Sequence, residues 1–334
     1  MKWLFVFINL LIFPVLWSQN DSISKKPQLY RDKIVLYADH GFNAAPFSIR
    51  YPFSSTVNHV SFKHNLKPLL GFGIQYKWFG LRVGFSLKSQ YRPTSRYGNS
   101  EYFDIGFRLN VKRTFWDIDF RNYKGYVIKD AYKWNDTLDA LHPNLLMPNI
   151  KIFSLSVNSW YFRSKDYRMS AVLGTNDEFK KTRKTWYFKS TFNIFGVGNN
   201  ASQLAPIPDI DSTDGRGRVK SLSAIDLGLV PGYAYTKRYN YWQASVFGGL
   251  GGVIQAKWYA HDSITRGFIG LAPRIDLRFV AGYSHPKYFF WFTSDFDIKN
   301  IQQQKLLYLQ TYYQLRLVAG VRLDKKSGKK SDSN

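Results

Sequence analysis

Hydrophobic and polar residues alternate with a period of two along most of this chain. Residues 79–88, 102–112 and 269–282 show this pattern, and residues 306–323 form the longest such run. Successive side chains of a β-strand point to opposite faces, so each run predicts a strand with one apolar face and one wet face. The body of the chain is therefore predicted to be all-β.

Three features favour a membrane barrel over a soluble sandwich, which also alternates. Several runs are longer than the usual soluble strand of about five or six residues, as a tilted membrane strand must be. Charged residues and glycines occupy the polar faces, and aromatic residues gather near strand ends, as in 288–291. Barrels of this type carry aromatic girdles at both membrane interfaces and a polar interior. We therefore expect a closed antiparallel transmembrane β-barrel.

The number of strands follows from counting the alternating runs. There are thirteen candidates: 33–51, 69–78, 79–90, 101–112, 114–123, 150–162, 166–175, 184–195, 220–236, 240–259, 265–283, 287–298 and 305–323. Because bacterial single-chain barrels have an even number of strands, one run must be dropped or split. We expect twelve strands, with the first run outside the barrel; the alternative is fourteen, with that run broken near Phe42–Pro46.

Charged residues on the polar faces are expected to line the interior. The predicted lining residues are Arg82, Lys88, Arg108, Lys112, Arg274, Asp276, Arg278, Asp295, Asp297, Arg316 and Arg322. Basic residues outnumber acidic ones in this set, so an open lumen would favour anions. In the last run, Leu317 is expected to touch lipid and its neighbour Arg316 the wet interior.

The two ends of the chain differ from its body. Residues 1–18 combine one Lys, a long apolar run and a final Ser18, which is typical of a secretory signal peptide cleaved near Ser18–Gln19. An uncleaved N-terminal membrane helix is the alternative. Residues 19–323 are assigned to the barrel with a short N-terminal extension, and residues 324–334 to a disordered basic tail. The predicted location is the outer membrane of a Gram-negative cell.

Charge and composition limit the partners. The chain of 334 residues has a formal charge of +24 and no cysteine, which excludes disulfides, thiolate metal sites and a cysteine nucleophile. Because an exported protein does not ordinarily meet intracellular DNA, nucleic acid is not expected as a partner. The expected partners are outer-membrane lipid, lipopolysaccharide and, during biogenesis, the barrel assembly machinery. The sequence does not identify any other protein partner.

Catalytic signals in the sequence are weak, and no cofactor or metal is predicted. The adjacent residues His261, Asp262 and Ser263 contain triad residue types, but neighbours in a chain cannot adopt the relay geometry. Asp117 with Asp119, and Asp295 with Asp297, each share one strand face at about 6–7 Å, which overlaps the spacing of glycosidase carboxylates. We favour charge pairing with lumen arginines instead. These are Arg108, Arg121, Arg274, Arg278, Arg316 and Arg322.

Several stretches resemble one known family. They are KSTFNIFG within 180–196, LGLVPGYAYTKRYNYWQASVFGGLGG at 227–252, LGFGIQYKWFGLRVGFSL at 70–87 and DIDFRNYKGYVI at 117–128. These stretches are similar to the uncharacterised envelope-protein family of domain of unknown function 4421. The resemblance covers most of the chain beyond the predicted signal peptide and implies an outer-membrane barrel, but it implies no catalytic residues.

The sequence leaves three functions open. The favoured one is a non-enzymatic outer-membrane barrel that serves as a narrow pore or as an envelope scaffold. The first alternative is a barrel-wall hydrolase acting on envelope lipid or polysaccharide. The second is a soluble periplasmic barrel that holds a ligand in its cup.

Overall fold

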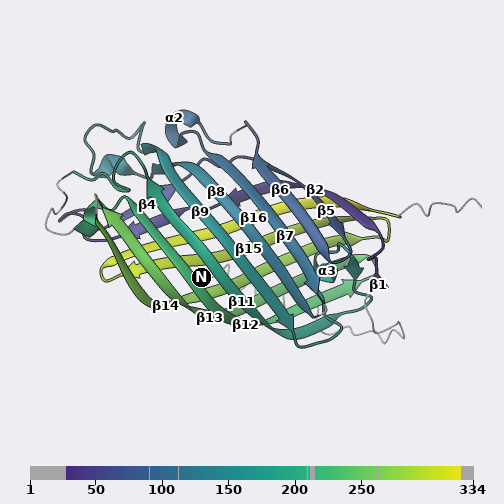
Figure 1. Cartoon of the computed structure of the whole chain (residues 1–334). Helices are drawn as coiled ribbons and strands as arrows, with labels where there is room; N and C mark the ends of the chain where they lie inside the picture. Colours follow the sequence, from purple (N-terminus) through teal and green to yellow (C-terminus); the bar gives the residue numbers. More distant parts are fainter. Residues whose placement is uncertain are drawn as a thin grey trace, which may run out of the picture.

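Twelve antiparallel strands close into one barrel (Figure 1). The computed structural model describes residues 28–89, 91–111, 113–208, 210, 215–261 and 264–324. The ring consists of β2 (Ile34–Ala44), β5 (Leu69–Tyr76), β6 (Phe79–Ser86), β7 (Glu101–Val111), β8 (Thr114–Ile128), β9 (Leu145–Phe162), β11 (Arg183–Asn199), β12 (Ser221–Tyr239), β13 (Trp242–His261), β14 (Ile264–Ser284), β15 (Tyr288–Gln303) and β16 (Leu306–Leu323). Pairing of β2 with both β16 and β5 closes the ring. The predicted closed barrel and its twelve strands are confirmed.

The count of twelve arises differently from the expectation. The run 33–51 does contribute a barrel strand, β2, and then breaks at Pro46 before the short β3 (Phe47–Arg50). The run 166–175 forms no strand and contains the helical turn α3 (Met169–Val172). Dropping the first run was therefore wrong, because the surplus run was 166–175.

The two ends of the barrel are built differently. We call the end where β2 begins and β16 ends the terminal end. Its turns are short, as at 77–78 and 240–241, except for residues 163–182, which join β9 to β11. This inner segment contains α3 and the two-residue β10 (Asp177–Glu178), which pairs with β1 (Gln28–Leu29). In Figure 1, α3 and β1 lie together at this end.

The opposite end, the loop end, holds the longer connections and a narrower wall. It carries the short helices α2 (Thr94–Tyr97), η2 (Ala131–Lys133) and η3 (Gly215–Arg218). Here β3 and β4 (His59–Lys63) form a hairpin that bridges β16 and β8. Because β5, β6 and β7 stop below this hairpin, the wall changes from twelve strands to ten toward the loop end.

The two faces of the barrel wall have opposite chemistry. Outward positions are apolar and exposed, as at Leu315 and Leu317, whereas the intervening Arg316 is 6% exposed. Inside, one apolar cluster fills the loop end around Phe47, Phe62 and Tyr308, and a second surrounds the inner segment. No helix in the described part of the chain is long and apolar enough to cross a membrane. The predicted signal peptide and the tail beyond Asp324 lie outside the described residues.

A buried histidine at the loop end makes stability depend on pH. His64 follows β4, packs against Tyr123 and Tyr126, and lies 3.4 Å from the Asn43 carbonyl oxygen. Burial lowers the pKa of His64 to about 4, because the charged imidazolium is poorly solvated there. The histidine of the unfolded chain takes up its proton near pH 6.5, whereas the folded protein resists protonation down to about pH 4. The free energy of unfolding is therefore unaffected by His64 above pH 6.5 and falls as the pH drops from there toward 4.

We expect the free energy of unfolding to fall by about 2 kcal/mol between pH 7 and pH 5 through this residue alone. Urea titration in detergent micelles at the two pH values measures this change. His64→Gln keeps a polar side chain without the ionisation and should remove most of the fall. An equal fall in His64→Gln would show that another group is responsible.

Candidate functional site

The interior at mid-height contains an ion-pair network drawn from four strands. Asp39 of β2 accepts two hydrogen bonds from Arg82 of β6, at 2.6 Å to Nε and 2.7 Å to Nη2. Arg82 also pairs with Asp104 of β7. Arg316 of β16 lies 3.9 Å from Asp39 and 3.6 Å from Asp104. Two carboxylates thus balance two guanidinium groups, and all four side chains are buried.

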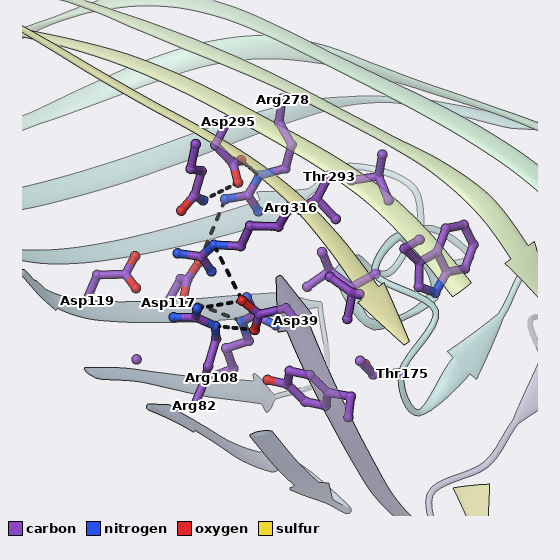
Figure 2. Close-up of a pocket in the computed structure, with 17 residues that line it drawn as sticks. Asp39, Arg82, Arg108, Asp117, Asp119, Thr175, Arg278, Thr293, Asp295 and Arg316 are labelled. Atoms are coloured by element: carbon purple, nitrogen blue, oxygen red, sulfur yellow. Dashed lines mark hydrogen bonds and ion pairs between the residues drawn. The ribbon is translucent and has the colours of Figure 1, made fainter. Parts of the chain in front are cut away.

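A second set of charges lies beside the first (Figure 2). Asp117 of β8 contacts Arg108 at 3.8 Å and Arg278 of β14 at 3.7 Å. Arg278 also binds Asp295 of β15. The neighbouring Asp119 pairs with Arg121 at 3.1 Å, so each of these carboxylates has an arginine partner.

Further pairs extend toward the loop end. Asp276 accepts hydrogen bonds from Lys189 Nζ at 2.9 Å and from the Tyr187 hydroxyl at 2.8 Å. Arg274 pairs with the buried Asp226. Lys299 reaches across to β9 and donates to two serine hydroxyls, those of Ser154 and Ser156, each at 2.9 Å.

Two adjoining cavities remain between these charges. They share Asp117, Arg278 and Asp295 in their walls. Their volumes are about 40 and 50 Å³, room for roughly three to five water molecules each.

The inner segment closes the terminal end of one of these cavities, whose wall includes Leu173 and Thr175. Arg322 donates hydrogen bonds to the Gly174 carbonyl at 2.6 Å and the Thr175 carbonyl at 2.9 Å. Gly174 has a φ of +56° and lies against the Trp291 ring, where a Cβ atom would fall 2.1 Å from the ring. A side chain at this position would therefore collide with the wall.

Further contacts fix the same segment. Gln243 donates to the carbonyls of Ala171 and Val172 at 3.1 and 3.2 Å. Arg238 pairs with Glu178, which also accepts a 2.8 Å hydrogen bond from the Tyr30 hydroxyl. Burial raises the pKa of Asp177, whose carboxylate oxygen accepts a hydrogen bond from Ser170.

The predicted lining residues divide into three groups in the structure. Most lie inside the barrel: Arg82, Arg108, Arg274, Asp276, Arg278, Asp295, Asp297, Arg316 and Arg322. Lys88 does not lie in the lumen, because β6 ends at Ser86 and the Lys88 side chain beyond it is exposed. The assignment of Lys88 to the lumen is corrected. Lys112 lies outside the described residues.

Sequence reasoning missed several acidic and basic partners. Asp39 and Asp226 are central to their ion pairs, Lys189 completes the pair with Asp276, and Lys299 donates to serine hydroxyls. Asp39 lies on the same strand face as the apolar residues Val35 and Tyr37. That face was therefore not recognised as lumen-facing from the sequence. Along the inward face of β2, the apolar Val35 and Tyr37 are followed by the charged Asp39. Such a change on one face of a strand was the signal that could have located Asp39 inside the barrel.

Among the catalytic candidates that the structure describes, no reaction centre is assembled. Asp262 and Ser263 lie outside the described residues, and His261 ends β13. Among the residues that the structure describes, no three His, Asp or Glu side chains are grouped to hold a metal ion. Asp117, Asp119 and Asp295 each form an ion pair with an arginine.

Solved structures with a similar outline are outer-membrane proteins of several kinds. The outer membrane protease OmpT from Escherichia coli has 7% identity and a TM-score of 0.40, with 91% of this chain and 99% of that chain covered. The COG4313 outer membrane channel from Pseudomonas putida F1 has 10% identity and a TM-score of 0.30, with 91% and 100% covered. The translocator domain of the autotransporter NalP from Neisseria meningitidis has 7% identity and a TM-score of 0.33, with 87% and 88% covered.

Sequence comparison is more specific. None of the curated protein sequences matches the chain. The model of one family, described as domain of unknown function (DUF4421), matches residues 30–323, which include every strand of the barrel ring. The chain therefore belongs to the DUF4421 family.

Proposed function

We propose that this protein is a non-enzymatic outer-membrane barrel whose resting interior is closed, and that it acts as an envelope scaffold. The observation that carries the proposal is the filling of the interior at three levels. The inner segment closes the terminal end, the ion-pair network crosses mid-height, and an apolar cluster occupies the loop end.

The outer face supports the membrane location. Exposed side chains on the ring are apolar across neighbouring strands, including Leu227, Ile254 and Leu277. Aromatic residues such as Trp78, Trp242 and Tyr288 lie exposed near the terminal end, as interfacial girdles do. A water-soluble barrel would leave this apolar surface uncovered.

A closed interior favours the scaffold over the pore. Most of the mid-height charges form ion pairs, so they do not form the ring of unpaired like charges that selects ions. The cavities between them hold only a few water molecules. The same small volume argues against a hydrolase that admits a polysaccharide between the aspartates.

Planar-bilayer recording tests the closed state. Purified protein that has inserted, shown by a heat-modifiable band on a gel, should give no single-channel steps because all three levels are closed. Outer-membrane fractionation of the same protein tests its location. Steady anion-selective steps from the unmodified protein would contradict the closed scaffold and favour the pore.

A further inference from the structure

Strand pairing in the barrel wall is interrupted along one line near the loop end. β14 pairs with β13 from Ile264 to Tyr283, but with β15 only from Asp276 to Ser284. Residues 264–275 of β14 and 298–303 of β15 therefore have no strand partner on their facing edges within the described sheet. We call this line the seam.

The seam is built into the sequence and is not a frayed end. Pro273 has no N–H group to donate, so β14 offers one donor fewer within the unpaired stretch, although its register with β13 continues through this residue. Side chains from inside the barrel cap the neighbouring carbonyl groups instead. Gln255 donates to the Asn300 carbonyl at 3.0 Å, and Arg274 donates to the carbonyls of Ile298 and Pro273 at 3.4 and 3.2 Å.

An apolar row on the outer surface ends at the seam. Leu227 of β12, Ile254 of β13 and Leu271 of β14 are direct neighbours across the sheet. They are 62%, 64% and 82% exposed, and Ile269 beside them is also 82% exposed. The lipid-facing apolar surface therefore extends without a break to the unpaired edge of β14.

A buried lysine lies behind that edge. Lys257 of β13 is only 8% exposed, and its Nζ atom lies over the inner face of Gly270, 3.0 Å from the position that a Cβ atom would occupy. Among the described residues, no ion-pair or hydrogen-bond partner of Lys257 is found. A buried cation without a partner is unfavourable, so this position favours an anion.

We propose that the seam binds the phosphate head group of an anionic membrane lipid. This proposal rests on the membrane location proposed above. The acyl chains lie on the row of Leu227, Ile254 and Leu271, and the phosphate passes the free edge of β14 to reach Lys257. The separation is short, because Nζ lies over β14 itself and adjacent strands are only about 4.8 Å apart. Gly270 leaves the inner face of β14 open at this point.

Native mass spectrometry of the barrel in lipid nanodiscs tests the site. The probes are phosphatidylglycerol and, as a zwitterionic comparison, phosphatidylcholine. Wild-type protein should retain one phosphatidylglycerol after activation, at several-fold higher occupancy than phosphatidylcholine. Lys257→Gln should lower that occupancy about fivefold or more, whereas Lys257→Arg should keep it. Lys151→Gln, which removes an exposed cation from β9, is the charge-matched control and should retain the lipid as wild type does.

A reversible cross-link tests the seam in one folded sample. Ile275→Cys combined with Ile298→Cys places a thiol pair next in register after Asp276 and Asp297, in a chain without other cysteines. Oxidation should close the seam and lower phosphatidylglycerol retention, and reduction should restore it. Inorganic phosphate added at millimolar concentration should compete only weakly, because it lacks the acyl chains.

The outcomes separate the two proposals. Equal retention by Lys257→Gln and wild type, or by the oxidised and reduced pair, overturns the lipid site and leaves the β14 edge for strand pairing with another polypeptide. Complete competition by phosphate overturns the lipid assignment in favour of free phosphate. Failure of the wild-type barrel to enter nanodiscs at all would contradict the membrane location itself.

Discussion

Arg82→Ala is expected to lower the free energy of unfolding by about 3–5 kcal/mol, the range for removing one partner of a buried ion pair. Arg82 supplies both hydrogen bonds to Asp39 and pairs with Asp104. Without it, two buried carboxylates share the single guanidinium group of Arg316, at 3.6 Å or more. Urea titration in detergent micelles, followed by tryptophan fluorescence, measures the change.

A second substitution separates charge balance from packing. Asp104→Asn in the Arg82→Ala background leaves one carboxylate, Asp39, facing one guanidinium, Arg316, and should recover part of the lost stability. Arg50→Ala removes an exposed arginine of β3 and should change stability by less than about 0.5 kcal/mol. If Arg82→Ala behaves like Arg50→Ala, the mid-height network does not stabilise the fold.

The periodic parts of the chain could be predicted from sequence for a clear physical reason. A wall strand has lipid on one face and polar groups on the other, so the alternation at 306–323 reports its geometry directly. The run 166–175 misled because the inner segment lies inside the barrel. Met169 to Val172 are buried on every side, and their apolar character therefore reports no face.

The ion pairs that cross the lumen could not be predicted from the alternating pattern. The contact of Asp39 with Arg82 joins β2 to β6, which are not adjacent in the ring. The change from twelve strands to ten depends on the register of Phe62 with Ile128, and the seam depends on where β14 stops pairing with β15. Each of these registers depends on the pairing of all the strands in the closed ring, so no local sequence pattern shows it. Pro273, which has no N–H group to donate, was a local sign of weakened pairing on β14.

Leu317→Arg is expected to destabilise the folded barrel by about 2–4 kcal/mol, the range for a cation on the lipid face at the midplane. Leu317 is 47% exposed on the outer face of β16 and faces Phe292 of β15 and His40 of β2 across the sheet. It lies near the middle of its strand, so its side chain cannot reach the membrane interface easily. The yield of heat-modifiable folded protein in the outer membrane measures the effect.

Leu323→Arg provides the control for depth. Leu323 is the last residue of β16, on the same outer face and similarly exposed, but it lies at the terminal end, where a cation should cost only about 0–1 kcal/mol. Leu315→Arg, one outward position from Leu317, should assemble as poorly as Leu317→Arg. Because the three variants carry the same substitution on the same face, only depth in the bilayer distinguishes them. Equal yields for all three would mean that this face does not contact hydrocarbon, and the membrane-embedded scaffold would have to be abandoned together with the lipid site at the seam.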